Sequence, residues 1–340
     1  MNKRARNLIF IGSIVIIIAA ITTYYAAKKI YQGTKINIVT LRLNWIPDPT
    51  FTGPYVAKYN GFWSKKGLDV DIKVGGYQIN PISLVASGEN DFGIAGADRV
   101  LYAVANKIPI KAIAVDFKQN PVGWVVREES NIKTPKDFEG HKIGFKYGEE
   151  SEFIFYALMK KYSVNIDKIE RIPVEYSLNP FFMKIVEAFP VYMNEEPHRI
   201  RDKGIKIRII NPAEYGIQIY GNVVFTSDKL IKTNPELIRR FLEGYIDGWE
   251  FARNNPGISA KLLKENVKEM DQATIERVLN STLELLDEKA GERKSKIGSM
   301  NKEGWEKIKE MLVNYGELNK DINVEDAFDM SFIEKIIEKK

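Results

Sequence analysis

Apolar residues recur along the chain with two different periods, and these periods predict its secondary structure. From residue 36 onward, short apolar runs bounded by Gly, Pro, Asp or Asn alternate with stretches of helical periodicity. In residues 68–74, for example, apolar and polar residues alternate strictly, which is typical of a half-buried strand. Further strands are expected at 91–96, 110–115, 122–127, 142–145, 205–210 and 222–226, and helices at 53–63, 81–87, 98–106, 151–162 and 180–188. This alternation predicts an α/β fold with mostly parallel sheets that are covered by helices.

The last third of the chain has helical periodicity throughout. Thr233 and Glu236 have the spacing of a capping box, Pro235 lies early in the helix that follows, and the apolar residues of 237–249 fall on one face. Further helices are expected at 258–267, 271–286, 301–316 and 325–338. The sequence therefore predicts that the α/β body ends in a helical C-terminal extension.

The first 33 residues have the pattern of a targeting segment. Bases precede a nearly continuous apolar run from Leu8 to Ala27, and two lysines follow it. The whole run of about 20 residues can just span a bilayer, whereas its most apolar part of about 14 residues suits a signal peptide. A clear A-x-A cleavage site is missing, and Tyr24 and Tyr25 fall where an interfacial aromatic belt would lie. We therefore expect an uncleaved membrane anchor and an extracytoplasmic body, with a cleaved signal and a periplasmic or secreted body as the alternative.

The net charge of the chain is concentrated at its N-terminus. The formal net charge is +5, and residues 1–29 hold five bases and no acid, so the remaining body is neutral. Nucleic-acid-binding proteins use basic surfaces to neutralise phosphates, and a neutral body without long Lys/Arg runs argues against such a partner. The absence of cysteine excludes disulfides, thiol catalysis, iron–sulfur clusters and a lipid-modified cysteine.

Residue patterns typical of catalysis or metal binding are sparse. His141 and His198 are the only histidines, and without cysteine a zinc site would depend mostly on carboxylates. The chain contains no G-x-S-x-G, Walker A, G-x-G-x-x-G or H-E-x-x-H motif. Glu149 and Glu150 stand at the start of a predicted helix, where the positive helix end favours acids without any catalytic role. We expect no enzymatic activity, no metal and no cofactor.

Aromatic, amide and acidic residues gather where predicted strands end. They are Asn44, Trp45, Tyr77, Asp98, Trp124, Tyr176, Tyr215, Tyr220 and Asn222. In open α/β sheets, ligands lie beyond the carboxyl ends of the strands, and aromatic faces with a few polar groups hold small planar ligands. Each of these residues alone is compatible with a place in the core, but together they predict a ligand pocket.

Several segments resemble one known family in order and spacing. They are LNWIPDPTFTGPYVAKYNGFWSKKGLDVDI (43–72), PISLVASGENDFGIAGAD (81–98), IPIKAIAV (108–115), IKTPKDFEGHKIGF (132–145), NPAEYGIQIYGNVVFT (211–226) and NPELIRRFLEGYIDGWEFARNNP (234–256). The sequence is similar to the NMT1/THI5-like group of type 2 periplasmic binding proteins, the substrate-binding components of ABC importers. This resemblance covers nearly all of residues 36–256.

The resemblance implies a two-lobed fold with a ligand clamped between the lobes by hinge closure. The implied organisation is an N-terminal signal or anchor with its linker at 1–33, lobe one at 34–125 and 223–340, and lobe two at 126–222. The implied partners are a small-molecule ligand and an ABC permease, and the membrane is contacted through the N-terminal segment.

The resemblance also implies a ligand, most simply a thiamine-precursor pyrimidine or a similar small heteroaromatic compound. Carboxylates suit an aminopyrimidine because they accept hydrogen bonds from its exocyclic amine. By position, Asn44 and Trp45 match an N-W-x-P motif of the family, Glu195 or Glu196 an N-E-P motif, and Tyr215 and Tyr220 a Y-G…Y-G segment. Tyr77, Asp98 and Glu149 complete the predicted ligand-binding set.

Three alternatives remain open at the sequence level. The superfamily contains fungal enzymes that make the pyrimidine from their own histidine and a lysine-bound pyridoxal phosphate, but Ala95 and Arg99 stand at those two positions here. A ligand-sensing ectodomain is the second alternative, and a binding protein for riboflavin, a sulfonate or nitrate is the third. Asp48 and Phe51 replace the Asn and His of many relatives, so the polarity of the pocket is expected to differ from theirs.

Overall fold

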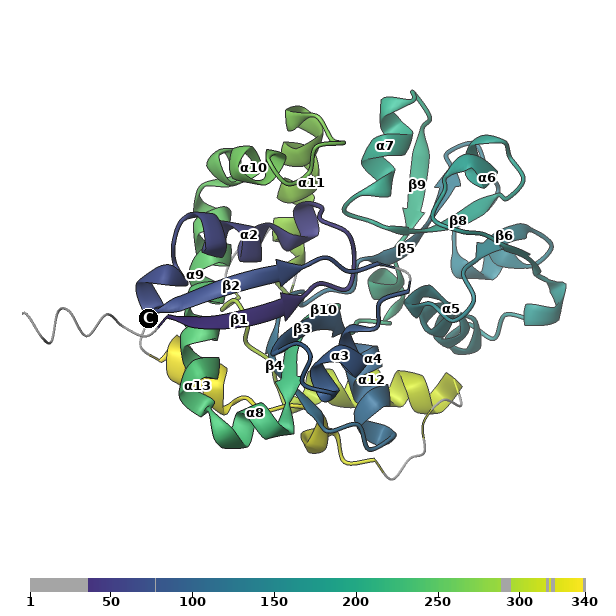
Figure 1. Cartoon of the computed structure of the whole chain (residues 1–340). Helices are drawn as coiled ribbons and strands as arrows, with labels where there is room; N and C mark the ends of the chain where they lie inside the picture. The colour runs from purple at the N-terminus through teal and green to yellow at the C-terminus, as the bar shows by residue number, and fades with distance from the viewer. Residues whose placement is uncertain (1–35, 77, 289–294, 316–317, 319–321, 339–340) are drawn as a thin grey trace, which may run out of the picture.

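The computed structural model describes residues 36–338 apart from 77, 289–294, 316–317 and 319–321. In this part of the chain the strands form two five-stranded sheets, and each sheet is the centre of one lobe (Figure 1). The first lobe contains, in spatial order, β2 (Leu68–Lys73), β1 (Asn37–Arg42), β3 (Phe92–Gly96), β10 (Asn222–Ser227) and β4 (Ile110–Val115). The second lobe contains β7 (Glu170–Pro173), β6 (Lys142–Phe145), β8 (Ala188–Tyr192), β5 (Val122–Arg127) and β9 (Ile207–Ile210). The predicted α/β class with two lobes is confirmed.

Each described sheet contains one strand that runs against the others. β1 pairs in parallel with β2 and β3, whereas β10 is antiparallel to both β3 and β4. In the second lobe β6 pairs in parallel with β7 and β8, whereas β5 is antiparallel to β8 and β9. β10 and β5 each follow a passage of the chain from one lobe to the other. The sheets are therefore mixed. In each sheet four of the five strands run in the same direction, as expected, but the reversed strand makes half of the eight strand pairings antiparallel.

Helices cover both sheets. The first lobe carries α2 (Thr52–Tyr59), α3 (Pro81–Ala86), α4 (Ala97–Ala105), α8 (Asp228–Thr233), α9 (Pro235–Asn254), α10 (Pro256–Lys264), α11 (Gln272–Leu285), α12 (Lys302–Tyr315) and α13 (Ser331–Ile337). The second lobe carries α5 (Glu150–Lys161), α6 (Asn179–Phe182) and α7 (Glu196–Asp202). Strands such as β3 and β5 are buried almost along their whole length, as expected for strands with helices on both faces.

Two predicted helices are wrong in part. In 180–188, helix α6 is short because Lys184 adopts a left-handed φ of 58°, and the buried run that follows forms β8. In 325–338, a 3₁₀ turn at Val324–Ala327 is separated from α13 by an extended Phe328, which forms a bridge with β4. Both segments contain short apolar runs, and such a run does not by itself distinguish a buried strand from a buried helix.

The N-terminus of α9 differs by one residue from the predicted capping box. The side chain of Asn234 accepts a hydrogen bond from the backbone N–H of Leu237 at 3.2 Å and caps the helix. Thr233 is instead the last residue of α8, where its hydroxyl donates to the Lys229 carbonyl. Asn and Thr are both good N-cap residues, so the sequence pattern located the helix start without identifying the cap.

Close packing of α2 against α9 forms the core of the first lobe. Gly53 and Gly248 lie at the contact, and a β-carbon at Gly248 would clash with the carbonyl oxygen of Gly53. A β-carbon at Gly53 would clash with the indole of Trp249, which is fully buried. The two glycines therefore allow the helix axes to approach more closely than larger residues permit.

The chain passes between the lobes twice, at 116–121 and 211–221. The two passages lie side by side, because the N–H of Gly221 donates to the Phe117 carbonyl at 2.9 Å and the N–H of Asp116 donates to the Asn222 carbonyl at 2.9 Å. The predicted lobe boundaries at 125/126 and 222/223 lie slightly beyond these passages, and they remain predictions.

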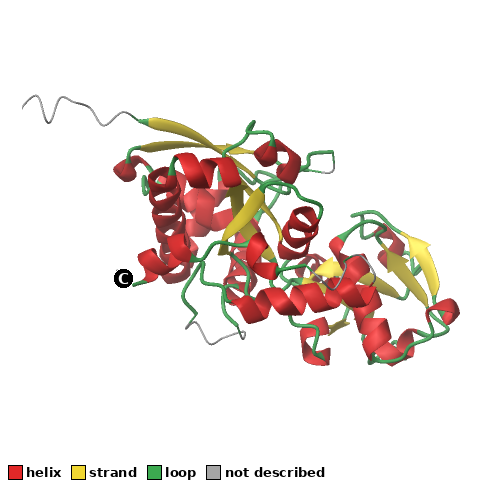
Figure 2. Ribbon diagram, turned by 90° about the horizontal axis from the view of Figure 1, so that it is seen from below, coloured by secondary structure: helices red, strands yellow, loops and turns green. Residues whose placement is uncertain are grey.

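Figure 2 shows helices packed where the two lobes meet, and the C-terminal helices contact both lobes. Helix α11 packs against α7 of the second lobe, where Asn194 donates to the Thr282 hydroxyl at 3.0 Å and His198 Nε2 lies 2.9 Å from the Ser281 hydroxyl. Helix α12 packs against α5, and α13 packs against α9 and β4 of the first lobe. The helical extension therefore connects the lobes as well as covering the first one.

The predicted signal or membrane anchor at 1–33 lies outside the described residues. None of the helices described between residues 36 and 338 has both the length and the hydropathy needed to cross a bilayer. The anchor therefore remains a prediction from the sequence.

Candidate functional site

A cleft of about 450 Å³ lies between the two lobes. It is formed by the segments that follow β1, β2 and β3 in the first lobe and those that follow β6, β7 and β8 in the second. The carboxyl ends of these parallel strands face the cleft, which is the usual ligand position in open α/β sheets. The site is thus assembled from the ends of strands that lie far apart in the sequence.

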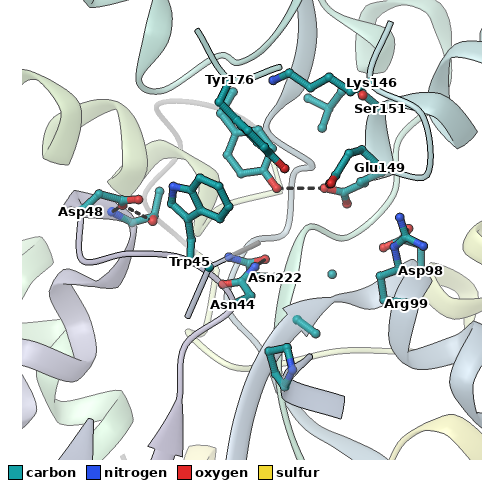
Figure 3. Close-up of a pocket in the computed structure, with 18 of the residues that line it drawn as sticks. Asn44, Trp45, Asp48, Asp98, Arg99, Lys146, Glu149, Ser151, Tyr176 and Asn222 are labelled. Atoms are coloured by element: carbon teal, nitrogen blue, oxygen red, sulfur yellow. Dashed lines mark hydrogen bonds and ion pairs between the residues drawn. The ribbon is translucent and has the colours of Figure 1, made fainter. Parts of the chain in front are cut away.

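Aromatic rings from both lobes form one wall of the cleft (Figure 3). The ring centroids of Trp45, after β1, and Tyr176, after β7, lie 4.6 Å apart with an interplanar angle of 37°. The Lys146 ammonium lies 4.6 Å from the centroid of the Tyr176 ring. At this spacing a third ring does not fit between Trp45 and Tyr176, so a planar ligand either stacks on an outer face of the pair or separates the rings.

One acidic cluster in the cleft consists of Asp48, Glu195 and Glu196, and we call it the Asp48 cluster. Asp48 accepts hydrogen bonds from both the backbone N–H and the hydroxyl of Thr50. Glu196 accepts from the backbone N–H of Tyr192 at 2.8 Å. These bonds hold the Asp48 carboxyl group at the N-terminus of the 3₁₀ helix η1 (Pro49–Phe51) and the Glu196 carboxyl group at the N-terminus of α7.

Burial makes ionisation of the Asp48 cluster unfavourable. Desolvation raises the pKa of Asp48 to about 6, although the hydrogen bonds from Thr50 oppose this effect. Burial, together with the charges of Asp48 and Glu196, raises the pKa of Glu195 to about 8. Burial also raises the pKa of Glu196 and lowers that of Lys146, and the attraction between these two groups opposes both shifts. The cluster therefore holds protons near neutral pH unless a positive group approaches it.

A second pair of acids, Asp98 and Glu150, lies in another part of the cleft, and we call it the Asp98 pair. Glu150 accepts hydrogen bonds from the Asn120 amide at 2.6 Å and the Tyr192 hydroxyl at 3.1 Å. Burial and the charge of Asp98 raise the pKa of Glu150 to about 8. Burial also raises the pKa of Asp98, and the neighbouring Arg99 charge offsets part of this shift.

An amide at the end of β1 completes the polar lining. Asn44 donates from Nδ2 to Oδ1 of Asn222 at 3.2 Å. Its own Oδ1 is buried and has no hydrogen-bond partner among the described residues. A buried acceptor without a partner is costly, so Asn44 is ready to accept a hydrogen bond from a ligand.

The structure brings six of the nine predicted site residues together around the cleft. They are Asn44, Trp45, Asp98, Glu149, Glu195 and Glu196. Tyr77 lies outside the described residues. The structure shows their positions only, and a role of any of them in binding remains a prediction.

Tyr215 and Tyr220 do not line the cleft. Tyr220 packs edge-on against Trp305, and its hydroxyl lies 3.2 Å from both the side chain and the backbone N–H of Asn301. Tyr215 packs against Tyr162 on the outside of the second lobe. Both residues lie in the passage between β9 and β10. Tyr220 there packs against helix α12 and Tyr215 against Tyr162, so both side chains point away from the cleft.

Lys146, Tyr192 and Asn120 contribute to the site but were not among the predicted residues. Lys146 follows β6, and Tyr192 ends β8, a strand that is not among those predicted from the sequence. Asn120 lies in the passage between the lobes, and its side chain supports both Glu150 and the Tyr220 carbonyl. A correct assignment of β8 would have placed Tyr192 at a strand end.

The charge of the cleft favours ligands that donate hydrogen bonds or carry positive charge. Its described lining contains six carboxyl groups and only two basic side chains, Arg99 and Lys146. A positive group lowers the pKa of neighbouring carboxyl groups and so binds them in their ionised form, whereas an anion gains no such attraction. Among the described residues, no three acidic or histidine side chains converge as metal ligands.

Residues 48–258 match the family described as NMT1/THI5 like. The formylaminopyrimidine-binding protein of Halalkalibacterium halodurans is 25% identical over 297 residues, which cover 86% of this chain and 90% of that protein. The riboflavin-binding protein RibY of Chloroflexus aurantiacus is 22% identical over 307 residues, which cover 87% of this chain and 86% of that protein.

The fold is shared with a solved structure of low sequence identity. The periplasmic aliphatic sulphonate binding protein SsuA of Escherichia coli superposes with a TM-score of 0.71 at 15% identity, covering 86% of this chain and 92% of SsuA. At this identity the similarity shows the two-lobed fold and leaves the ligand to be inferred from the cleft itself.

Proposed function

The chain belongs to the NMT1/THI5-like family, and on this premise we propose that it is an extracytoplasmic solute-binding protein that delivers a small nitrogen-containing heteroaromatic ligand to an ABC importer. The two-lobed fold, the cleft between the lobes and the solute-binding relatives support this proposal. The proposed ligand is a thiamine-precursor pyrimidine or a compound of similar size and polarity. The N-terminal segment would hold the body at the membrane beside its permease.

The observation that carries the proposal is an aromatic wall between two sets of carboxyl groups. Trp45 and Tyr176 offer ring faces, and the Asp48 cluster offers acceptors for an exocyclic amine. Asn44 offers a further acceptor through its unpartnered Oδ1. An aminopyrimidine presents a flat ring with amine donors at its edge, which matches these groups in both shape and hydrogen-bonding sense.

Hinge closure supplies the mechanism of capture. Because Trp45 belongs to the first lobe and Tyr176, Glu195 and Glu196 to the second, a ligand in the cleft contacts both lobes at once. A ligand that touches both lobes binds the closed form more tightly than the open form and shifts the population toward closure. The two adjacent passages at 116–121 and 211–221 provide the hinge.

Ligand-induced thermal stabilisation tests the proposed function. Binding to the folded state adds RT ln(1 + [L]/Kd) to stability, so a true ligand raises the unfolding temperature of the full-length protein in a concentration-dependent manner. We expect a shift with 4-amino-5-hydroxymethyl-2-methylpyrimidine or formylaminopyrimidine, tested beside thiamine and riboflavin. Taurine, a zwitterionic sulfonate, and nitrate, an anion, serve as controls that lack an aromatic ring. A shift with taurine or nitrate and none with the heteroaromatic compounds would refute the proposal.

A further inference from the structure

Two carboxyl groups face each other across the cleft from different lobes. Asp98 lies in the first turn of α4 in the first lobe, and Glu150 begins α5 in the second. In Figure 3, Asp98 and Arg99 lie on the opposite side of Trp45 from Asp48, although all four residues belong to the first lobe. Asp98 and Glu150 lie close enough for the charge of Asp98 to raise the pKa of Glu150, so ionisation of both groups is unfavourable unless a proton or a positive group lies between them.

Asp98 is buried, and no side chain donates a hydrogen bond to it. Its side chain is 1% exposed, and neither carboxyl oxygen accepts a hydrogen bond of good geometry within the described part of the chain, although the backbone N–H groups of Asp98 and Arg99 favour its charged form. The nearest positive group is Arg99, whose Nε lies 3.8 Å from Oδ2 of Asp98. The Arg99 guanidinium also donates to the Gly148 carbonyl and lies 4.8 Å from the Phe153 ring, so it is held toward the second lobe rather than over Asp98.

Glu150 retains capacity to accept further hydrogen bonds. Each of its two carboxyl oxygens accepts one bond, from the Asn120 amide and the Tyr192 hydroxyl respectively. A carboxylate oxygen has two acceptor positions, so one remains on each oxygen. The bonds to Asn120 and Tyr192 fix the orientation of the carboxyl group relative to the cleft.

Gly96 leaves space beside both carboxyl groups. A β-carbon at this position would lie 2.5 Å from Oδ1 of Asp98 and 3.3 Å from Oε1 of Glu150. Any larger residue would therefore fill the volume on which the two oxygens converge. Gly96 has an extended φ of −61°, so backbone conformation does not require glycine here.

From this geometry we propose that the Asp98 pair is a subsite for one positively charged nitrogen of the ligand, and that this charge joins the two lobes in the closed form. The subsite is distinct from the Asp48 cluster, which receives the ring amine in the proposed function. A ligand that fills both has a flat ring with an amine at its edge and a second, protonated amine on a short arm. The inference rests on the proposed function, because it assumes that the ring occupies the aromatic wall.

The titratable surroundings of the pair are consistent with a cation subsite. Asp98 and Arg99 face Glu150 from α4, Glu149 from the residue before α5, and Tyr192 from β8. Burial and the Asp98 charge raise the pKa of Glu150 to about 8, so a proton occupies the pair near neutral pH when no cation is bound. An ammonium group replaces that proton, and its binding is therefore coupled to proton release.

Two probes that share a ring and differ in one substituent test the inference. They are 4-amino-5-aminomethyl-2-methylpyrimidine, which carries an ammonium group, and 4-amino-5-hydroxymethyl-2-methylpyrimidine, which is neutral at the same position. Calorimetric titration of the full-length protein at neutral pH should give a Kd about tenfold lower for the ammonium probe, as expected for hydrogen bonds between charged groups. Glu150→Gln and Asp98→Asn should each reduce this ratio to about one.

A control variant and the pattern of outcomes distinguish failure of the inference from failure of the proposed function. Glu170→Gln removes an exposed carboxyl of the same lobe outside the cleft, and it should keep the tenfold ratio. Equal affinities for the two probes in the unmodified protein, or a ratio retained in both Glu150→Gln and Asp98→Asn, would overturn the inference while leaving the proposed function intact. Failure of both probes to bind would overturn the inference, whereas the proposed function would still be decided by the thermal-shift series with formylaminopyrimidine, thiamine and riboflavin. Because two separate variants are used, poor folding of one does not remove the test.

Discussion

Trp45 of the first lobe contacts an aromatic ring of the second lobe. Its indole faces Tyr176 across the cleft, and the Lys146 ammonium lies over the other ring of the pair. Aromatic side chains provide a large contact area to a flat ligand with little loss of rotamer entropy. Among the described residues of the first lobe that line the cleft, Trp45 offers the largest aromatic surface.

We expect Trp45→Ala to weaken binding of the pyrimidine ligand by about 1–3 kcal/mol, the usual loss when an aromatic stacking partner is removed. Calorimetric titration with 4-amino-5-hydroxymethyl-2-methylpyrimidine measures this change. Tyr102→Ala, which removes an exposed aromatic ring of α4 outside the cleft, is the matched control. Unchanged affinity in Trp45→Ala would show that the indole supports the cleft wall without touching the ligand.

Glu195 illustrates how a buried carboxyl group in the cleft reduces the stability of the unliganded protein. Its pKa rises from an ordinary 4.5 to about 8 in the folded state, first through burial and then through Asp48 and Glu196. Between these two pH values the folded protein holds a proton that the unfolded chain has released. Stability therefore falls as pH rises from about 4.5 to about 8.

Glu195→Gln should remove this loss, because glutamine does not titrate. At pH 8 we expect the unliganded variant to be more stable than the unmodified protein by about 1–3 kcal/mol, with the difference shrinking toward pH 5. Thermal unfolding across this pH range measures the effect, and Glu170→Gln controls for the loss of an exposed carboxyl. A parallel pH dependence in both proteins would contradict a raised pKa for Glu195.

At the residue scale, the sequence predicts positions at strand ends better than it predicts side-chain orientation. Asn44 and Trp45 follow an apolar strand directly, and both line the cleft. Tyr220 was assigned to the pocket by its motif, but the C-terminal helix α12 provides Trp305 and Asn301 as competing partners. These partners lie about 80 positions further along the chain, beyond the reach of local pattern.

The contact between α2 and α9 determines the packing of the first lobe. The two helices meet through Gly53 and Gly248, and the buried face of α9 includes Phe241, Tyr245 and Trp249. Closely packed interiors do not accommodate an added carbon without shifting neighbouring backbone. The contact is therefore a sensitive point for stability, although it lies away from the cleft lining.

Gly248→Ala should destabilise the protein by about 1–3 kcal/mol through overpacking against the Gly53 carbonyl. Chemical denaturation measures the loss. Gly257→Ala provides the control, because a β-carbon at Gly257 in α10 meets nothing within 4 Å. An alanine at 248 that is tolerated as well as the one at 257 would contradict the close approach of the two helices.

At the element scale, long periodic helices were predicted correctly and short buried segments were not. The expected helices at 271–286 and 301–316 agree with α11 and α12 within one residue at each end. The segment 180–188 was predicted as one helix, but only the short helix α6 forms there, and the buried strand β8 begins at Ala188. The antiparallel pairing of β10 and β5 was not predicted from the sequence. Each of these strands follows a passage between the lobes, and the direction in which it enters its sheet depends on the tertiary fold.

In the whole molecule, the lobes touch each other beyond the cleft. Helix α11 contributes Ser281 and Thr282 to the contact with His198 and Asn194 of the second lobe. These bonds join groups that must separate when the lobes open. They therefore favour the closed form even before a ligand is bound.

Replacing Ser281 with Ala and Thr282 with Val together should increase the open population of the unliganded protein. The double change leaves the buried Asn194 amide without its acceptor, which is costly in the closed form and harmless once water reaches it. We expect a larger radius of gyration in small-angle X-ray scattering and weaker ligand affinity. Thr233→Val removes a comparable hydroxyl from α8 of the first lobe alone and should change neither quantity. An unchanged radius in the double variant would show that other contacts hold the lobes together.

Diffraction from crystals of the protein grown with 4-amino-5-hydroxymethyl-2-methylpyrimidine tests the central claim most directly. The account predicts density for the ring in the cleft between the lobes, within about 4 Å of an aromatic face of Trp45 or Tyr176. The exocyclic amine should lie at hydrogen-bond distance, about 2.7–3.2 Å, from a carboxylate of the Asp48 cluster. A pyrimidine bound outside the cleft, or a cleft in which Lys146 and Arg99 hold an anion instead, would contradict it.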